Sequence, residues 1–172
     1  MPKDTIQQRA KEDHADYVTW AKMGLITLTD GIVVDYAFLA QDILDLTRGL
    51  NLKRLAFDDW KMDRLLVELN KIGHDLPLES WRQGYKSMSP ALDGLEEDLL
   101  KKQLAHGNNP VLGMCAHNAV ALPDPAGNRK LDKSRSTGRI DGLQALAMAR
   151  GVEAKVVIEE ANVYEERGLR TL

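Results

Sequence analysis

A short apolar run between two amphipathic helical patterns constrains the fold of this 172-residue chain more than any other feature. The run, residues 52–57, is bounded by charge and predicts a buried strand. Before it, Asp35 predicts the N-cap of a helix that Gly49 closes. After it, Gly73 ends a second helix, whose apolar face carries Met62, Leu65, Leu66 and Leu69. This order of elements predicts an α/β layer.

The rest of the chain adds shorter elements. Asp30-Gly31 predicts a hairpin or tight turn, and residues 74–78 predict a second short strand. Ser89-Pro90 has the chemistry of a helix start, and that helix should stop near residues 106–110. Residues 111–122 predict a short helix that runs into a strand.

We divide the chain into three parts. Residues 1–24 form a polar N-terminal segment that we expect to be helical, and residues 25–151 form the main domain. Within that domain, residues 123–138 are a long, basic connection, and loops of this length are usually functional. Residues 152–172 form a charged tail, with a strand expected at residues 154–158.

Composition narrows the class of protein. The charged fraction of 28% is that of an ordinary globular protein, and the net charge of −3 does not by itself indicate a nucleic-acid partner. Cys115 is the only cysteine, which excludes internal disulfides and cysteine-rich zinc sites. No apolar stretch approaches the roughly 20 residues of a membrane helix, and the N-terminus lacks the apolar core of a signal peptide. We therefore expect a cytoplasmic protein without a membrane partner.

Asp58 is the first residue that suggests chemistry. It follows the expected strand directly, at the kind of sheet edge where α/β proteins bind ligands. A carboxylate there can hold a metal ion. In the alternative interpretation, Asp58 or Asp59 caps the helix that begins near Lys61. The two interpretations are compatible, and Trp60 is most simply a core residue over the end of the strand.

Asp141 is the second candidate, at the start of a helix rich in small residues. Composition alone favours a capping role for it, in which its charge interacts with the helix dipole. The preceding segment favours a functional role for Asp141 instead, because it holds five cations, which suit a polyanionic substrate. They are Arg129, Lys130, Lys133, Arg135 and Arg139. In the alternative interpretation this segment is a solvated loop. The histidines show no paired ligand spacing, and no glycine pattern predicts a phosphate-binding loop or an ATP site.

Several motifs occur in an order that resembles one known family. The chain resembles the C-terminal nuclease domain of tailed-phage terminase large subunits, over residues 17–150. The motifs that carry the resemblance are Tyr17-x-x-Trp20-x-x-x-Gly24-Leu25, Leu55-Ala56-Phe57-Asp58-x-Trp60, Gln83-Gly84-Tyr85-x-Ser87-Met88-Ser89-Pro90, His106-Gly107-Asn108-Asn109-Pro110-Val111-Leu112, Ala126-Gly127-Asn128, Asp132-Lys133 and Arg139-Ile140-Asp141-Gly142.

The resemblance implies an RNase H-like α/β nuclease that cuts double-stranded concatemeric DNA during viral genome packaging. Such enzymes use two divalent metal ions about 3.5–4 Å apart, and Mg²⁺ or Mn²⁺ suits an all-oxygen site. It also implies that Asp58 and Asp141 are catalytic metal ligands and that the five cations bind DNA. The implied partners are the terminase ATPase domain, the small subunit and the portal.

The sequence also departs from the family pattern. The family's first core strands, one of which carries an aspartate that bridges both metals, have no counterpart in the sequence. Asp13 and Asp16 lie in a helical pattern and are poor substitutes. We therefore expect a helix-rich, partial RNase H-like fold without the first core strands, from a prophage gene, with impaired activity in isolation. A non-catalytic remnant that binds DNA or a partner is the alternative, and a RuvC-like resolvase fits the flanking motifs less well.

Overall fold

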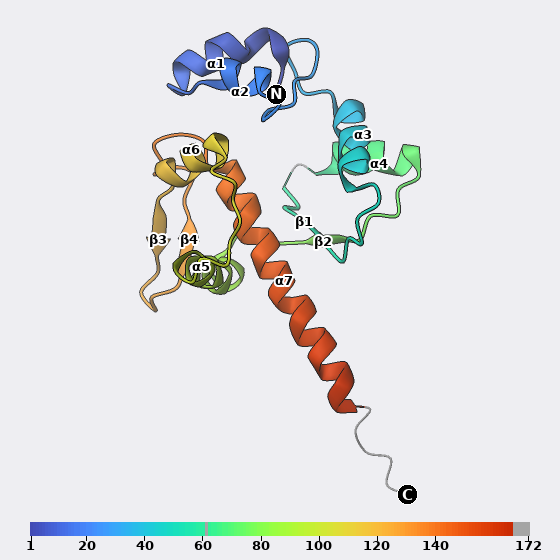
Figure 1. Cartoon of the computed structure of the whole chain (residues 1–172), viewed down its shortest axis with the longest axis vertical. Coiled ribbons are helices and arrows are strands. Elements are labelled where there is room, and N and C mark those ends of the chain that lie inside the picture. The colour runs from blue at the N-terminus through green and yellow to red at the C-terminus, as the bar shows by residue number, and fades with distance from the viewer. Residues whose placement is uncertain (61, 167–172) are drawn as a thin grey trace, which may run out of the picture.

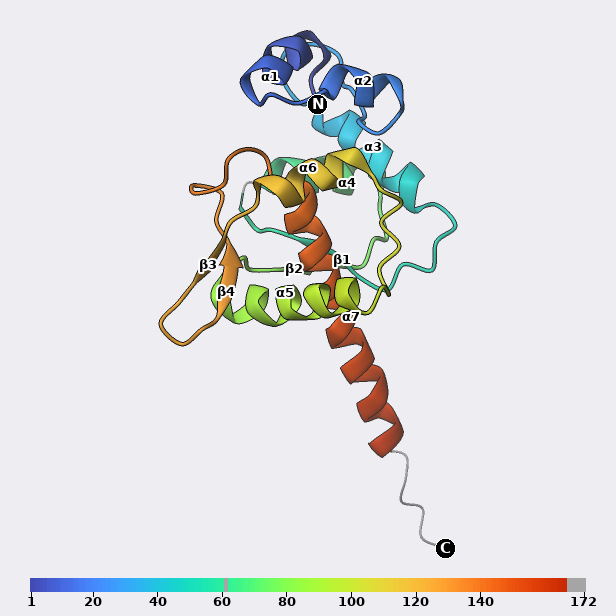
Figure 2. The same ribbon diagram turned by 60° about the vertical axis from the view of Figure 1, so that its left-hand side comes forward.

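The computed structural model describes residues 1–60 and 62–166, with side chains described as far as residue 157. Helices and short strands alternate between residues 36 and 100, and Figures 1 and 2 show how all the elements are arranged. In chain order the elements are η1 (Lys3–Thr5), α1 (Ile6–Glu12), α2 (Tyr17–Lys22), α3 (Tyr36–Thr47), β1 (Leu55–Phe57), α4 (Asp63–Ile72), β2 (Leu78–Ser80), α5 (Tyr85–Leu100), α6 (Pro110–Asn118), β3 (Ala121–Pro123), β4 (Arg129–Leu131) and α7 (Asp141–Glu166). The fold is mixed α/β and rich in helix, as expected.

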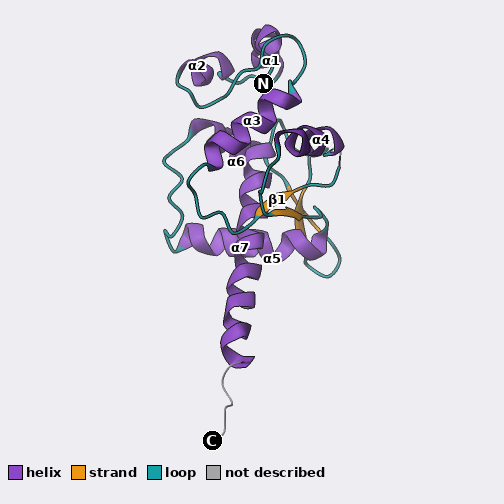
Figure 3. Ribbon diagram, turned by 90° about the vertical axis from the view of Figure 1, so that its right-hand side faces the viewer, coloured by secondary structure: helices purple, strands orange, loops and turns teal. Residues whose placement is uncertain are grey.

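Two small sheets organise the described strands. β1 and β2 pair in parallel with Phe57 opposite Ser80, and β3 and β4 form an antiparallel hairpin with Ala121 opposite Leu131. The predicted strands at residues 52–57 and 74–78 are therefore real but shorter and shifted by a few residues. The prediction of one continuous loop over residues 123–138 is wrong, because residues 129–131 form β4. Figure 3 shows that much more of the chain is helix than strand.

The core consists of two apolar clusters. The larger one lies between α5, α7 and the residue that follows β2, and includes Trp81, Met88, Leu95 and Ala147. Burial of such side chains supplies about 1.5–3 kcal/mol each. The smaller cluster joins α3 and α4, with Ala40, Leu65 and Leu69 buried. Figure 1 shows α7 running along the molecule between these parts.

The two predicted helices around β1 are confirmed, together with the start of α3 and the end of α4. The Asp35 side chain accepts hydrogen bonds from the backbone N–H groups of Ala37 and Phe38, so it caps α3. Gly73 ends α4 with φ +70°, a left-handed conformation that glycine adopts without strain. Leu46 is an exception on the apolar face of α3, since it is 70% exposed.

The start of α5 differs from the prediction. The helix begins at Tyr85 after Gly84, four residues before Ser89. Pro90 therefore lies inside the helix, where it lacks the N–H that would bond to the carbonyl of Lys86. Pro90 is exposed, so water can satisfy that carbonyl and the helix continues. The helix also ends at Leu100, before the expected stop at residues 106–110.

The expected strand at residues 154–158 is wrong. α7 runs without interruption from Asp141 to Glu166 and includes these residues. Met148 and Val152 extend the buried face of the helix, so tertiary packing outweighs the local strand preference of Val156 and Val157. The rest of the expected tail, residues 167–172, lies outside the described residues.

One further expectation fails, and of the hairpin or tight turn expected at Asp30-Gly31 the turn is observed. Trp60 is 77% exposed and is not a core residue. Residues 25–34 form no hairpin; Gly31 makes a turn at φ +81°, and Thr29 forms a single bridge to Pro2. The N-terminal segment is helical, as expected, through α1 and α2.

Candidate active site

Asp58 lies immediately after β1 and is half-buried. Its Oδ1 atom accepts a hydrogen bond from the backbone N–H of Trp60 at 3.2 Å, which forms a tight local turn. The first turn of α4 has no side-chain cap, so neither Asp58 nor Asp59 caps this helix. Lys61, where that helix was expected to begin, lies outside the described residues. The capping interpretation of Asp58 is therefore wrong, and its second oxygen is available for other contacts.

Asp141 is the first residue of α7, and its side chain is 66% exposed. Its Oδ1 atom accepts a hydrogen bond from Lys133 Nζ at 2.7 Å. A carboxylate at a helix N-terminus also interacts favourably with the helix dipole. The structure therefore joins two of the predicted site residues, one an acid and the other a cation.

The elements that carry the two acids pack on each other. β1 contacts α7, and a groove of about 500 Å³ runs between them. Leu55 and Ala56 line one side of the groove, and Ala145 and Ala149 line the other. Ala145 lies one turn of helix beyond Asp141. The lining extends along α7 as far as Val157 and includes neither Asp58 nor Asp141, so the groove shows only that the two elements pack on each other.

The first two predicted DNA-binding cations lie against α5. Arg129 pairs with Asp93 and with Glu96, the latter at 2.7 Å, and its backbone N–H donates to Ser89 Oγ at 3.1 Å. These contacts raise the pKa of the Arg129 guanidinium above its usual range, chiefly through its hydrogen bonds to the two carboxylates. Lys130 Nζ lies 5.0 Å from the centre of the Tyr85 ring. Both cations therefore attach the β3–β4 hairpin to α5.

Arg135 has only a weak intramolecular partner. Its Nε atom lies 3.8 Å from Asp132 Oδ2, and its side chain is 64% exposed. Hydrogen bonds from Ser134 lower the pKa of the Asp132 carboxyl. Arg135 and Lys133 are thus the most exposed of the five predicted cations.

Arg139 makes a contact that the sequence does not indicate. Its Nε atom donates to Asp13 Oδ2 at 3.1 Å, and the Tyr17 hydroxyl donates to the same oxygen at 3.0 Å. Tyr17 is only 2% exposed. Its burial, together with the hydrogen bond to Asp13, raises the pKa of Tyr17 to about 12. The N-terminal helices are therefore joined to the residue two positions before Asp141.

No local signal could have revealed this cluster. Asp13 and Arg139 are 126 residues apart in the sequence, and Asp13 reads locally as the end of a polar helix. Their pairing depends on α1 and α2 lying over the start of α7, the arrangement that Figure 1 shows.

The donor set fits a hard divalent cation in kind, because Mg²⁺ and Mn²⁺ prefer carboxylate oxygens. Within residues 1–60 and 62–157, however, no group of three or more histidine, cysteine, aspartate or glutamate side chains is arranged to hold a metal ion. Within these residues, Asp58 and Asp141 thus belong to no such group.

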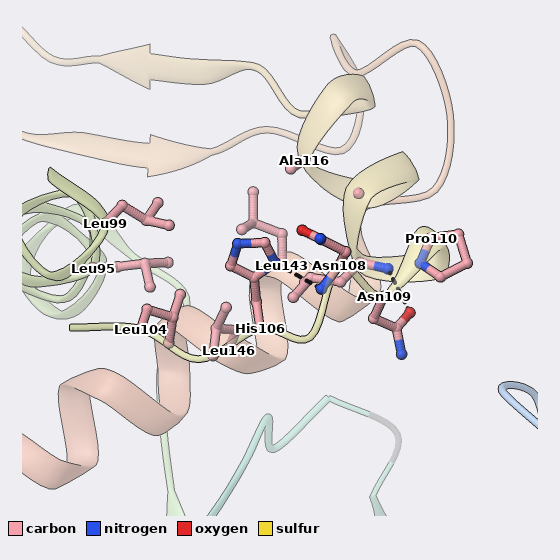
Figure 4. A pocket seen from close by; sticks show the side chains of 12 residues that line it. Leu95, Leu99, Leu104, His106, Asn108, Asn109, Pro110, Ala116, Leu143 and Leu146 are labelled. Carbon is pink, nitrogen blue, oxygen red and sulfur yellow. Dashed lines mark hydrogen bonds between the residues drawn. The ribbon is translucent and has the colours of Figure 1, made fainter. Parts of the chain in front are cut away.

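A separate apolar cavity of about 300 Å³ lies beside the motif at residues 106–112. Figure 4 shows the leucines of α5 and α7 facing this motif across the cavity. Asn109 caps α6 by accepting hydrogen bonds from the backbone N–H groups of Val111 and Leu112. The lining includes neither Asp58 nor Asp141, so this cavity is separate from the two acids.

Comparison with known proteins identifies the class. The family model described as the terminase large subunit, endonuclease domain, matches residues 1–156. The chain belongs to the endonuclease-domain family of terminase large subunits, which confirms the resemblance drawn from the motifs.

The chain is also similar to two relatives and to one solved structure. The terminase large subunit of Enterobacteria phage HK97 is 43% identical over 99% of this chain and 34% of the relative. Protein YmfN of Escherichia coli strain K12 is 28% identical over the whole chain and 39% of the relative. The crystal structure of the HK97 large terminase matches with a TM-score of 0.83 and 45% identity, over 88% of this chain and 32% of that one. The chain thus spans about a third of the length of these proteins.

None of the described helices is both long enough and apolar enough to cross a membrane.

Proposed function

We propose that this chain contributes to a metal-dependent endonuclease that cuts double-stranded DNA during viral genome packaging. One observation carries the proposal: the chain belongs to the terminase endonuclease family, and its two motif aspartates stand at ends of elements that pack together. Asp58 and Asp141 are the proposed catalytic residues and metal ligands. Such a metal, when bound, activates water and stabilises the leaving oxygen of a phosphodiester.

The chain's own residues have distinct proposed roles. Asp58 is oriented by its bond to the Trp60 N–H, which leaves one carboxylate oxygen for the cation. Lys133 holds Asp141 through an exposed ion pair, which is worth at most about 1 kcal/mol and is easily exchanged. Lys133 and Arg135 are the proposed phosphate contacts, since both side chains are more than half exposed. Arg129, Lys130 and Arg139 require the loss of an internal contact before they can reach DNA.

We further propose that the isolated chain cuts DNA poorly. The described side chains supply two of the carboxylates that the two-metal mechanism uses, and a partial ligand set binds metal weakly. We place its action in the host cytoplasm, together with a terminase ATPase domain, a small subunit and a portal. These partners come from the family to which the chain belongs.

Plasmid nicking tests this function directly. The purified chain should nick supercoiled plasmid slowly with Mn²⁺ and not at all with EDTA. Asp58→Asn and Asp141→Asn should each abolish the residual nicking. Asp59→Asn is the matched control, because Asp59 is the exposed neighbour of Asp58 and should leave nicking unchanged. Nicking that persists in both Asp58→Asn and Asp141→Asn would reject these residues as catalytic.

A non-catalytic DNA-binding or partner-binding module is the second candidate. The observation in its favour is that no group of three metal-ligating side chains occurs within the described residues up to 157. This candidate predicts DNA binding that does not depend on Mn²⁺, with no nicking above the EDTA control. The same plasmid assay, combined with a binding assay, separates the two functions.

A further inference from the structure

Arg82 differs from every cation that the sequence pattern singled out. It is exposed, and within the described part of the chain its guanidinium makes no hydrogen bond or ion pair. The five predicted cations all have an internal partner, four of them a carboxylate and one a tyrosine ring. An unpaired guanidinium binds an incoming phosphate without first losing another contact.

The sheet topology places Arg82 at the same edge of the sheet as Asp58. β1 and β2 are parallel, so their carboxyl ends lie at the same edge of the sheet. Phe57 stands opposite Ser80, and the Trp81 N–H donates to the Phe57 carbonyl at 2.7 Å. By the same register Asp58 stands opposite Trp81, and Arg82 is the next residue along the chain at this edge of the sheet.

The residues on each side of Arg82 are held against α7. Trp81 is only 4% exposed, and its ring lies so close to the helix backbone that a Cβ atom on Gly151 would be 2.4 Å from it. On the other side, Gln83 Nε2 contacts Met148 Sδ at 3.7 Å. The backbone at Arg82 is thus fixed by its neighbours while its side chain extends into solvent. A rigid backbone under an exposed charged side chain is a favourable arrangement for positioning a ligand.

We infer that Arg82 binds a DNA phosphate next to Asp58 and so positions the duplex at this edge of the sheet. The inference rests on the proposed function, because it assumes that DNA is the substrate. The planar guanidinium matches two phosphate oxygens, which lysine, as a point charge, does not. Arg82 lies 47 positions before the first of the five predicted cations, Arg129, so the cation-rich segment gave no indication of it.

The test is binding of a short fluorescein-labelled DNA duplex to the full chain, measured by anisotropy in EDTA between roughly 50 and 200 mM salt. Arg82→Gln should weaken binding roughly three- to tenfold and reduce the slope of log affinity against log salt by about one. Arg82→Lys should keep the salt slope while recovering only part of the affinity, because it keeps the charge but loses the planar fork.

Arg48→Gln is the matched control. It makes the same change of charge, but Arg48 lies beside Leu52 and Pro77, which precede the amino ends of β1 and β2. It should bind DNA like the unmodified chain. If Arg82→Gln and Arg48→Gln bind equally well, the inference about Arg82 is wrong while DNA binding by the chain stands. If the unmodified chain does not bind the duplex at all, the proposed function itself fails.

Discussion

The segment at residues 129–139 and the edge formed by β1 and β2 use charge in different ways. The segment holds five cations, and each is engaged inside the molecule. The strand edge holds a single arginine after β2, and that arginine has no partner within the described residues. The difference teaches that the density of cations in a sequence does not measure their availability to a ligand. Many of them stabilise the fold instead.

The largest expected effect concerns the support of the strand edge. Gly151→Ala should lower the free energy of unfolding by about 1–3 kcal/mol, because the new Cβ would lie 2.4 Å from the Trp81 ring and 3.0 Å from Ala91. Denaturant unfolding measures this change. Gly113→Ala is the control, since its Cβ meets nothing within 4 Å; it should be neutral or stabilising by up to about 1 kcal/mol. Equal stability of the two variants would show that Trp81 has room to move.

The next prediction separates structural cations from DNA-binding ones. Arg139→Gln should destabilise the fold by about 1 kcal/mol, because it leaves the largely buried Asp13 carboxylate without its cation. Arg135→Gln should leave stability unchanged and weaken DNA binding, since its pair with Asp132 is long and exposed. Thermal unfolding and duplex anisotropy measure the two effects. If Arg139→Gln weakens DNA binding without loss of stability, Arg139 belongs with the DNA-binding cations after all.

The pH dependence tests the Tyr17–Asp13–Arg139 cluster. The pKa of Tyr17 is raised to about 12 in the fold, above the ordinary value of 10.0. The stability that this adds is fully present below pH 10 and is lost as the pH rises from 10 towards 12. Relative to the native chain, Tyr17→Phe should show a shallower loss of stability above pH 10, by at most about 1.4 kcal/mol per pH unit. Urea unfolding at pH 9 and pH 11 gives the comparison. Parallel pH profiles would show that Tyr17 is not held in its protonated form.

The smallest expected effect concerns Asp141. Lys133→Met removes the cation that pairs with this carboxylate, so Mn²⁺ should bind more tightly. The expected gain is only about twofold, because an exposed ion pair is weak. Titration with Mn²⁺ monitored by electron paramagnetic resonance measures the affinity. Lys101→Met is the control, because Lys101 pairs with Glu97 at the end of α5 and should leave Mn²⁺ binding unchanged. Equal affinity in the Lys133→Met variant and the native chain would argue against Asp141 as a ligand.

Local patterns were informative where a local cause decides the structure. The cap at Asp35 and the glycine at position 73 fix the ends of α3 and α4 through bonds and dihedral angles within a few residues. The order of motifs was sufficient to indicate the family. The strand predicted at residues 154–158 failed because a distant contact prevails, and α7 continues through these residues. Trp60 is exposed although it follows an apolar strand.

By itself, the sequence determined the family, the α/β order of elements and the two acids worth testing, because these depend on residue types and short spacings. Only the tertiary structure decided which charges are engaged. Arg139 pairs with Asp13 across 126 positions, and Arg82 comes to the same sheet edge as Asp58 because two strands separated by a helix pair in parallel. Electrostatic partners are chosen by proximity in space, which a linear pattern does not record.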